Sequence, residues 1–78
     1  MRAKKECLIL TFPTTVAAMQ WEKYCIVHGI SGRIIPVPRE ITAGCGLAWK
    51  TEPEEEGKLR KVAEEQEMKV EEMRVLWV

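Results

Sequence analysis

Cys45 is the residue of this sequence best suited to covalent chemistry, because a glycine stands on each side of it. Gly44 and Gly46 carry no Cβ atoms, so a large partner can approach the sulfur closely. Arg39 lies a few residues upstream, and a nearby guanidinium favours the thiolate, which is the nucleophilic form of cysteine. The segment therefore predicts a reactive thiol. The alternative is a tight turn that needs small residues for backbone reasons alone.

The other two cysteines fit structural roles better. Cys25 belongs to the apolar stripe of a predicted helix, and free cysteine is among the residue types most often found in cores. Cys7 stands on a predicted strand, on the face opposite Leu8 and Leu10, where it is either packed or part of a sheet-face contact. The three cysteines are far apart and include no C-x-x-C pair. They support neither a disulfide framework nor a structural zinc site, and we expect free thiols and no metal or cofactor.

The one histidine does not suit a catalytic dyad with Cys45. His28 ends the first predicted helix, about 20 Å along the axis from its start, and the start is where Cys45 is expected. The glycine pattern around Cys45 is also too short for a nucleotide-binding loop. These observations favour a carrier or binding protein over a stand-alone enzyme.

The charge balance excludes further classes of function. Twelve Lys and Arg residues match twelve Asp and Glu residues, so the net charge is zero and a nucleic-acid partner is not expected. The charged start is followed by an apolar run that breaks at Pro13, which is too short for a signal peptide core, and no stretch approaches a membrane span. We therefore expect a cytoplasmic protein without a membrane partner.

The elements that position these residues follow from apolar patterning and turn residues. Either Thr14 or Thr15 suits a helix N-cap, and Gly29 suits a helix stop. Proline in the second strand predicts an edge position. Strands are predicted at residues 7–12, 33–37, 46–51 and 73–78, and helices at 15–28 and 53–67. The buried sides of the helices are predicted to carry Ala18, Trp21, Cys25 and His28 in the first, and Leu59, Val62, Ala63 and Gln66 in the second.

This order predicts an α+β, ferredoxin-like βαββαβ fold: a four-stranded antiparallel sheet with two helices on one face. We expect a single domain over residues 1–78, with an ordered core from about residue 6. In this topology the first and second strands are parallel, with the third running back between them. Thr14, Thr15, Pro38, Arg39 and Cys45 then share one edge, and the loop folds back over the start of the first helix. The helix dipole and Arg39 would both lower the pKa of Cys45 from about 8.5.

The same loop carries a family resemblance. Residues 36–41 (PVPREI) and 44–48 (GCGLA), with residues 10–15 (LTFPTT), resemble the small bacterial family described as Putative Se/S carrier-like, over about residues 7–78. Trp21 and His28 stand where relatives usually have small residues, which concerns packing. The resemblance implies a thiol carrier, in which Cys45 matches the family's cysteine and Arg39 its arginine. Cys45 would take sulfane sulfur as a persulfide, or selenium, from a donor protein and pass it to an acceptor protein.

The alternative is a non-catalytic interaction module. Apolar residues are predicted on both faces of a sheet that has helices on only one face: Ile9, Ile34, Trp49, Leu76 and Val78. An uncovered apolar face favours a homodimer. A small anion bound at the first helix N-terminus, with Cys45 incidental, is the other form of this alternative.

Overall fold

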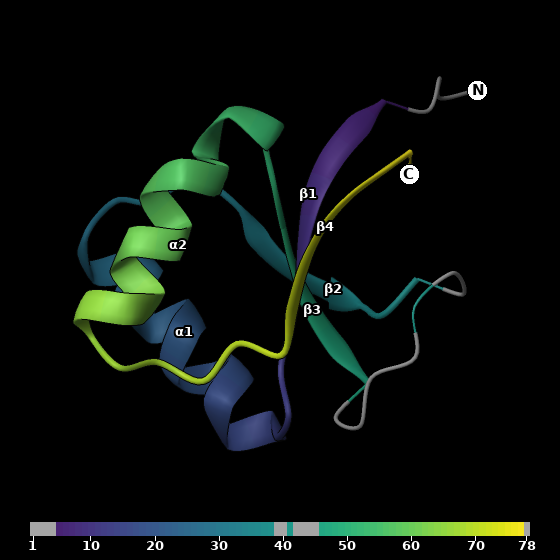
Figure 1. Cartoon of the computed structure of the whole chain (residues 1–78). Helices are drawn as coiled ribbons and strands as arrows, with labels where there is room; N and C mark the ends of the chain where they lie inside the picture. The colour runs from purple at the N-terminus through teal and green to yellow at the C-terminus, as the bar shows by residue number, and fades with distance from the viewer. Residues whose placement is uncertain (1–4, 39–40, 42–45, 78) are drawn as a thin grey trace.

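The computed structural model describes residues 5–38, 41 and 46–77, and the elements follow the predicted order. The strands are β1 (Glu6–Thr11), β2 (Arg33–Pro36), β3 (Leu47–Thr51) and β4 (Glu72–Trp77). The helices are α1 (Thr15–Val27), the short 3-10 turn η1 (Pro53–Glu55) and α2 (Glu56–Glu65). Figure 1 shows both helices on one face of the sheet. The α+β ferredoxin-like fold is confirmed.

The sheet has the strand order β2-β3-β1-β4, and every neighbouring pair is antiparallel. Ala48 of β3 is the register partner of Thr11 on one side and of Ile35 on the other. The ends of β1 and β2 therefore lie at the same edge as the start of β3. β2 is an edge strand as predicted, and β4 is the other one.

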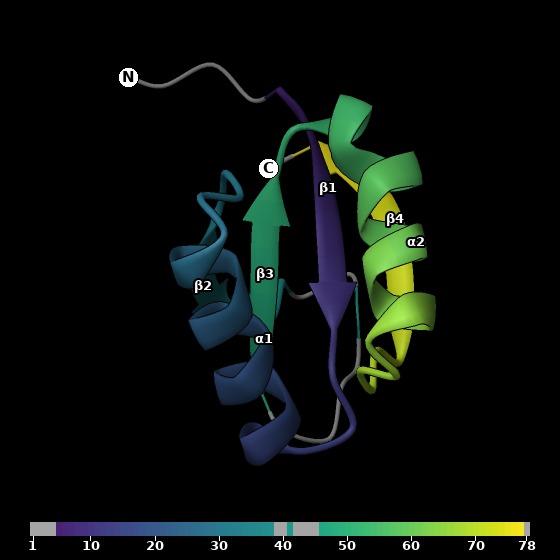
Figure 2. The same ribbon diagram turned by 90° about the vertical axis from the view of Figure 1, so that its left-hand side faces the viewer.

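The larger core lies between the sheet and the helices. Leu8 and Leu10 of β1, Trp49 of β3, Trp21 of α1 and Leu59 of α2 are all at most 2% exposed. The two helices lie side by side over the strands in Figure 2. Alternation along β1 and β3 sends these side chains to the helix side, where burying their apolar surface stabilises the fold.

A second, smaller cluster lies on the face without helices. Cys7 and Ile9 are 2% and 0% exposed there, and they pack with Ala48 and Ile41. Ile41 comes from the connection between β2 and β3, so one described residue of this connection packs on that face. The expectation of an uncovered apolar sheet face is therefore wrong for these residues. Trp49 faces the helices, and Val78 lies outside the described residues.

Two predicted buried positions are wrong, and both lie at helix ends. His28 is the C-cap of α1 and is exposed, with its ring stacked on Tyr24 at a centroid distance of 4.1 Å. Gln66 is the exposed C-cap of α2, and Glu67 after it has a φ of 52°. Once a helix ends, the 3.6-residue periodicity no longer places side chains on its buried side.

Candidate functional site

The site is organised at the sheet edge where β1 and β2 end and β3 begins. Pro36 pairs with Leu47, and Thr11 pairs with Ala48, so these strand ends are adjacent. The chain leaves β1 here toward the start of α1, and it leaves β2 toward the connection that contains Cys45. The predicted topology of this edge is confirmed for the described residues. Arg39, Gly44 and Cys45 lie outside them.

The N-terminus of α1 is formed by Thr14. Its hydroxyl oxygen accepts a hydrogen bond from the Ala17 N–H at 3.1 Å, and its carbonyl accepts from the Ala18 N–H at 3.2 Å. Thr15 is the first helical residue, and the first turn contains no acidic side chain. The positive end of the helix dipole is therefore not compensated from within α1. Of the two threonines, Thr14 is the N-cap.

Two backbone hydrogen bonds and one buried side chain hold the described part of the connection between β2 and β3. The Val37 N–H donates to the Gly46 carbonyl at 3.1 Å, which continues the strand pairing by one step. The Ile41 N–H donates to the Pro38 carbonyl at 3.0 Å, and the Ile41 side chain is only 7% exposed. The ends and the middle of the connection are thus fixed to the sheet.

The described part of this connection lies on the helix-free face (Figure 1) and not over the start of α1. Alternation explains the direction. Ile35 and Val37 project to the face that also carries Cys7 and Ile9, and Ile41 joins the same cluster. The expectation that the loop folds over α1 therefore fails for Val37 and Ile41. The prediction that Cys45 faces the helix N-terminus falls on residues outside the description.

Gly46 has a φ of 73°, a left-handed conformation that side chains other than glycine adopt at a cost. A Cβ added there would meet no described atom within 4 Å. The backbone therefore favours glycine at this position, and no described atom crowds the place of a Cβ. In the sequence, Gly46 immediately follows Cys45, the candidate nucleophile.

Neither of the two described cysteines is accessible. Cys7 is 2% exposed and belongs to the same buried cluster as Ile41, so of its two predicted roles the structure supports packing. Cys25 is fully buried between α1 and the sheet, as predicted. Burial raises the pKa of Cys25 to about 11, with a smaller opposing effect from the Lys58 charge. Its thiolate is therefore scarce at neutral pH.

The raised pKa of Cys25 has a consequence for stability. The unfolded chain loses this proton near pH 9, and the folded chain near pH 11, so the folded state retains the proton between these values. The stability is fully present below pH 9, and we expect a loss of about 2–3 kcal/mol as the pH rises to 11. Urea unfolding at a series of pH values measures it. Cys25→Ala should lack this part of the loss, and parallel curves for the two proteins would contradict the assignment.

A row of basic residues on the helix-free face was missed by the sequence reasoning. Arg33 is the register partner of Lys50, and Lys50 and Arg74 both pair with Ile9, so the three cations cross the sheet at one level. Like charges on paired residues are unfavourable unless an anion screens them. Strand alternation in the predicted elements is the signal that would have found them. They give this level of the face a positive charge, whereas Glu72, the register partner of Thr11, places a negative charge on the same face at the edge itself.

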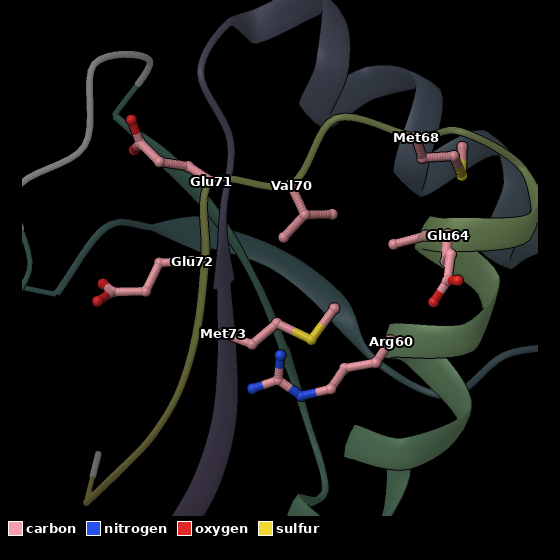
Figure 3. Close-up of a pocket in the computed structure, with 8 residues that line it drawn as sticks. Arg60, Glu64, Met68, Val70, Glu71, Glu72 and Met73 are labelled. Carbon is pink, nitrogen blue, oxygen red and sulfur yellow. The ribbon is translucent and has the colours of Figure 1, made fainter.

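A hollow of about 440 Å³ between α2 and the start of β4 contains none of the predicted site residues. Arg60, Met68 and Met73 line it, and Figure 3 shows the Met73 and Arg60 side chains directed toward one another. Arg60 is also bound to Glu56 at 2.7 Å. The carboxylates of Glu71 and Glu72 point away from Arg60 in this view. The hollow therefore shares no residue with the predicted site, but the start of β4, which lines it, pairs with the end of β1 at the same edge.

The described part of the chain lacks two features, a cluster of metal ligands and an apolar helix of membrane-spanning length. No group of three or more His, Cys, Asp or Glu side chains there is arranged to hold a metal ion. None of the described helices combines the length and apolar character that crossing a membrane requires.

Comparison with known proteins gives one result. A family model described as "Putative Se/S carrier protein-like" matches residues 6–74, which include β1, α1, the whole β2–β3 connection, β3 and α2. No curated protein and no solved structure matches the chain. The family match covers most of the sequence, and the segment with Cys45 lies inside it. The chain belongs to the Se/S carrier protein-like family.

Proposed function

We propose that this protein carries sulfur or selenium on Cys45. The observation that supports the choice of thiol is the burial of the other two cysteines, Cys7 and Cys25, at 2% and 0% exposure. The sequence contains three cysteines, so Cys45 is the one that remains as carrier. Family membership supports the class of cargo.

The transfer is a thiol–disulfide type of exchange. The Cys45 thiolate attacks the outer sulfur of a persulfide on the donor protein, and a new S–S bond forms as the donor's S–S bond breaks. The donor cysteine leaves as a thiolate, and Cys45 becomes a persulfide. An acceptor thiolate then attacks the outer sulfur of Cys45, which leaves as the thiolate again. A donor that carries selenium would react in the same way, and no outside oxidant is consumed.

The surroundings of the edge favour an anionic cargo. The uncompensated N-terminus of α1 lies at this edge, and the Thr14 hydroxyl, which accepts from Ala17, still has its own hydrogen to donate. Arg33, Lys50 and Arg74 add three positive charges to the face where Val37 and Ile41 lie, against one negative charge from Glu72 at the edge. In the proposal, Arg39, Gly44 and Thr15 complete the environment that stabilises the thiolate.

The test is the intact mass after incubation with a cysteine desulfurase and cysteine. The wild-type protein should gain the mass of one sulfur atom, and reduction should remove it. Cys45→Ala should gain none, whereas Cys25→Ala, the matched control, should gain as much as wild type. Equal gains in wild type and Cys45→Ala, or no gain in either, would refute the proposal.

Binding of a small anion at the N-terminus of α1 is a second candidate, favoured by the lack of acidic side chains in the first turn. Inorganic sulfate or phosphate is the probe. If binding survives in Cys45→Ser and no sulfur is accepted by the wild type, the anion-binding function replaces the carrier function.

A further inference from the structure

The outer side of α1 carries an apolar stripe that no described residue covers. Val16, Met19, Ile26 and Val27 are 62%, 60%, 70% and 70% exposed. They lie on the side opposite the buried residues of the same helix, which are Ala17, Ala18, Trp21 and Cys25. A helix that is apolar on both sides is typical of one that is covered on both sides.

The stripe holds four of the six large apolar side chains that are exposed among the described residues. Among the described residues, the other large apolar side chains with comparable exposure are Val75 and Trp77, and both belong to β4. Concentration of such side chains on one helix marks a surface that binds another protein. The question is which protein.

The charges of α1 favour a second copy of the same chain. Glu22 and Lys23 are the only charged residues of this helix, they have opposite signs, and they lie beside the middle of the stripe. A two-fold axis next to them brings each Glu22 toward the Lys23 of the other copy. The net charge of the surface is zero, so it offers no general attraction to a strongly charged partner.

Reversal of the helix direction about this axis also exchanges one pair of the stripe, Met19 and Ile26. Met19 stands three residues before Glu22, and Ile26 stands three residues after Lys23. An antiparallel pair around this axis therefore sets each Met19 against the other copy's Ile26. Val16 and Val27 extend the contact at the two ends.

We propose that two copies of this chain associate through α1, packed antiparallel around a two-fold axis beside Glu22 and Lys23. The exposed stripe is confined to one side of a single helix, a smaller surface than the roughly 800 Å² per partner that a stable complex buries. The limited area implies a reversible dimer with a Kd on the order of 1–100 µM. The helix-free face and the described part of the β2–β3 connection stay outside this contact, so donor and acceptor proteins can still reach them.

The test is the mass in solution by sedimentation equilibrium, from about 5 to about 500 µM, across the expected Kd. The wild type should pass from the monomer mass of 9.0 kDa toward twice that value. Glu22→Lys and Lys23→Glu should each place four like charges at the axis and raise the Kd at least 10-fold. An equimolar mixture of these two variants should dimerise again, because the mixed pair restores opposite charges.

Ile26→Asp provides a second test, since it removes apolar contact without touching the charges. It should also raise the Kd at least 10-fold, and its circular dichroism spectrum should match wild type, because Ile26 is exposed in the monomer. A wild type that stays monomeric at about 500 µM would overturn the proposal. So would a dimer that is unaffected by the charge and Ile26 variants, since it would use another surface.

Discussion

Replacing Gly32 with alanine is expected to lower the free energy of unfolding by about 3 kcal/mol, the sum of backbone strain and overpacking. Gly32 has a φ of 135°, which L-amino acids with a side chain rarely adopt. A Cβ at this position would lie 2.5 Å from Cε2 and 2.7 Å from Cζ2 of Trp49. Trp49 is 2% exposed in the core beneath the helices, so its ring cannot move aside without disturbing that packing.

Gly57→Ala is the matched control for this substitution. Gly57 lies in α2 without a positive φ, and a Cβ there would meet no described atom within 4 Å. Alanine should therefore stabilise the helix by about 0.5 kcal/mol. Urea unfolding monitored by circular dichroism measures both variants. A Gly32→Ala variant as stable as wild type would show that neither backbone strain nor overpacking acts at this position.

Ile41→Ala is expected to make Cys7 reactive and to destabilise the fold by about 2–4 kcal/mol, the usual cost of truncating a buried isoleucine. Ile41 is 7% exposed and packs with Cys7, Ile9 and Ala48 on the helix-free face. Truncation leaves a cavity directly over that cluster. We expect native-state alkylation of Cys7, read by peptide mass mapping near pH 8, to accelerate about 10-fold or more.

Ile30→Ala separates this local effect from general unfolding. Ile30 is 9% exposed, nearly the same as Ile41, but it belongs to the cluster on the helix side. Its truncation should cost a similar amount of stability and leave Cys7 covered. If both variants expose Cys7 at the same rate, global opening explains the reactivity, and Ile41 is not the cover.

The fold was predictable because its strongest signals are local. Apolar residues on alternate sides of β1, the Thr14 cap and the Gly29 stop each depend on neighbours within a few positions. Short connections and the handedness of crossovers then leave few topologies. The edge position of β2 followed from its prolines in the same way.

The cover of the helix-free face was not predictable, because periodicity tells which residues share a face but not what lies on that face. Ile41 covers Cys7 and Ile9 from a connection that has no regular pattern of its own. In α1 the buried side was predicted correctly at Ala18, Trp21 and Cys25, and the structure adds that large apolar side chains on the opposite side are exposed. In the site, the cap and the shared edge were predicted correctly. The roles of Arg39, Gly44 and Cys45 stay predictions.

The strand pairings differ in the number of residues that separate the two strands along the chain. This separation affects the order in which the pairings form. β1 pairs with β3 and with β4 at registers such as Leu8 to Thr51 and Glu6 to Trp77. β2 and β3 instead pair across residues 37–46, which makes them the most local strand pair of the described sheet. Loop closure costs less entropy over a short span, and hairpins form faster than long-range pairings. The connection that contains Cys45 is thus bounded by the pair of strands that the chain can close earliest.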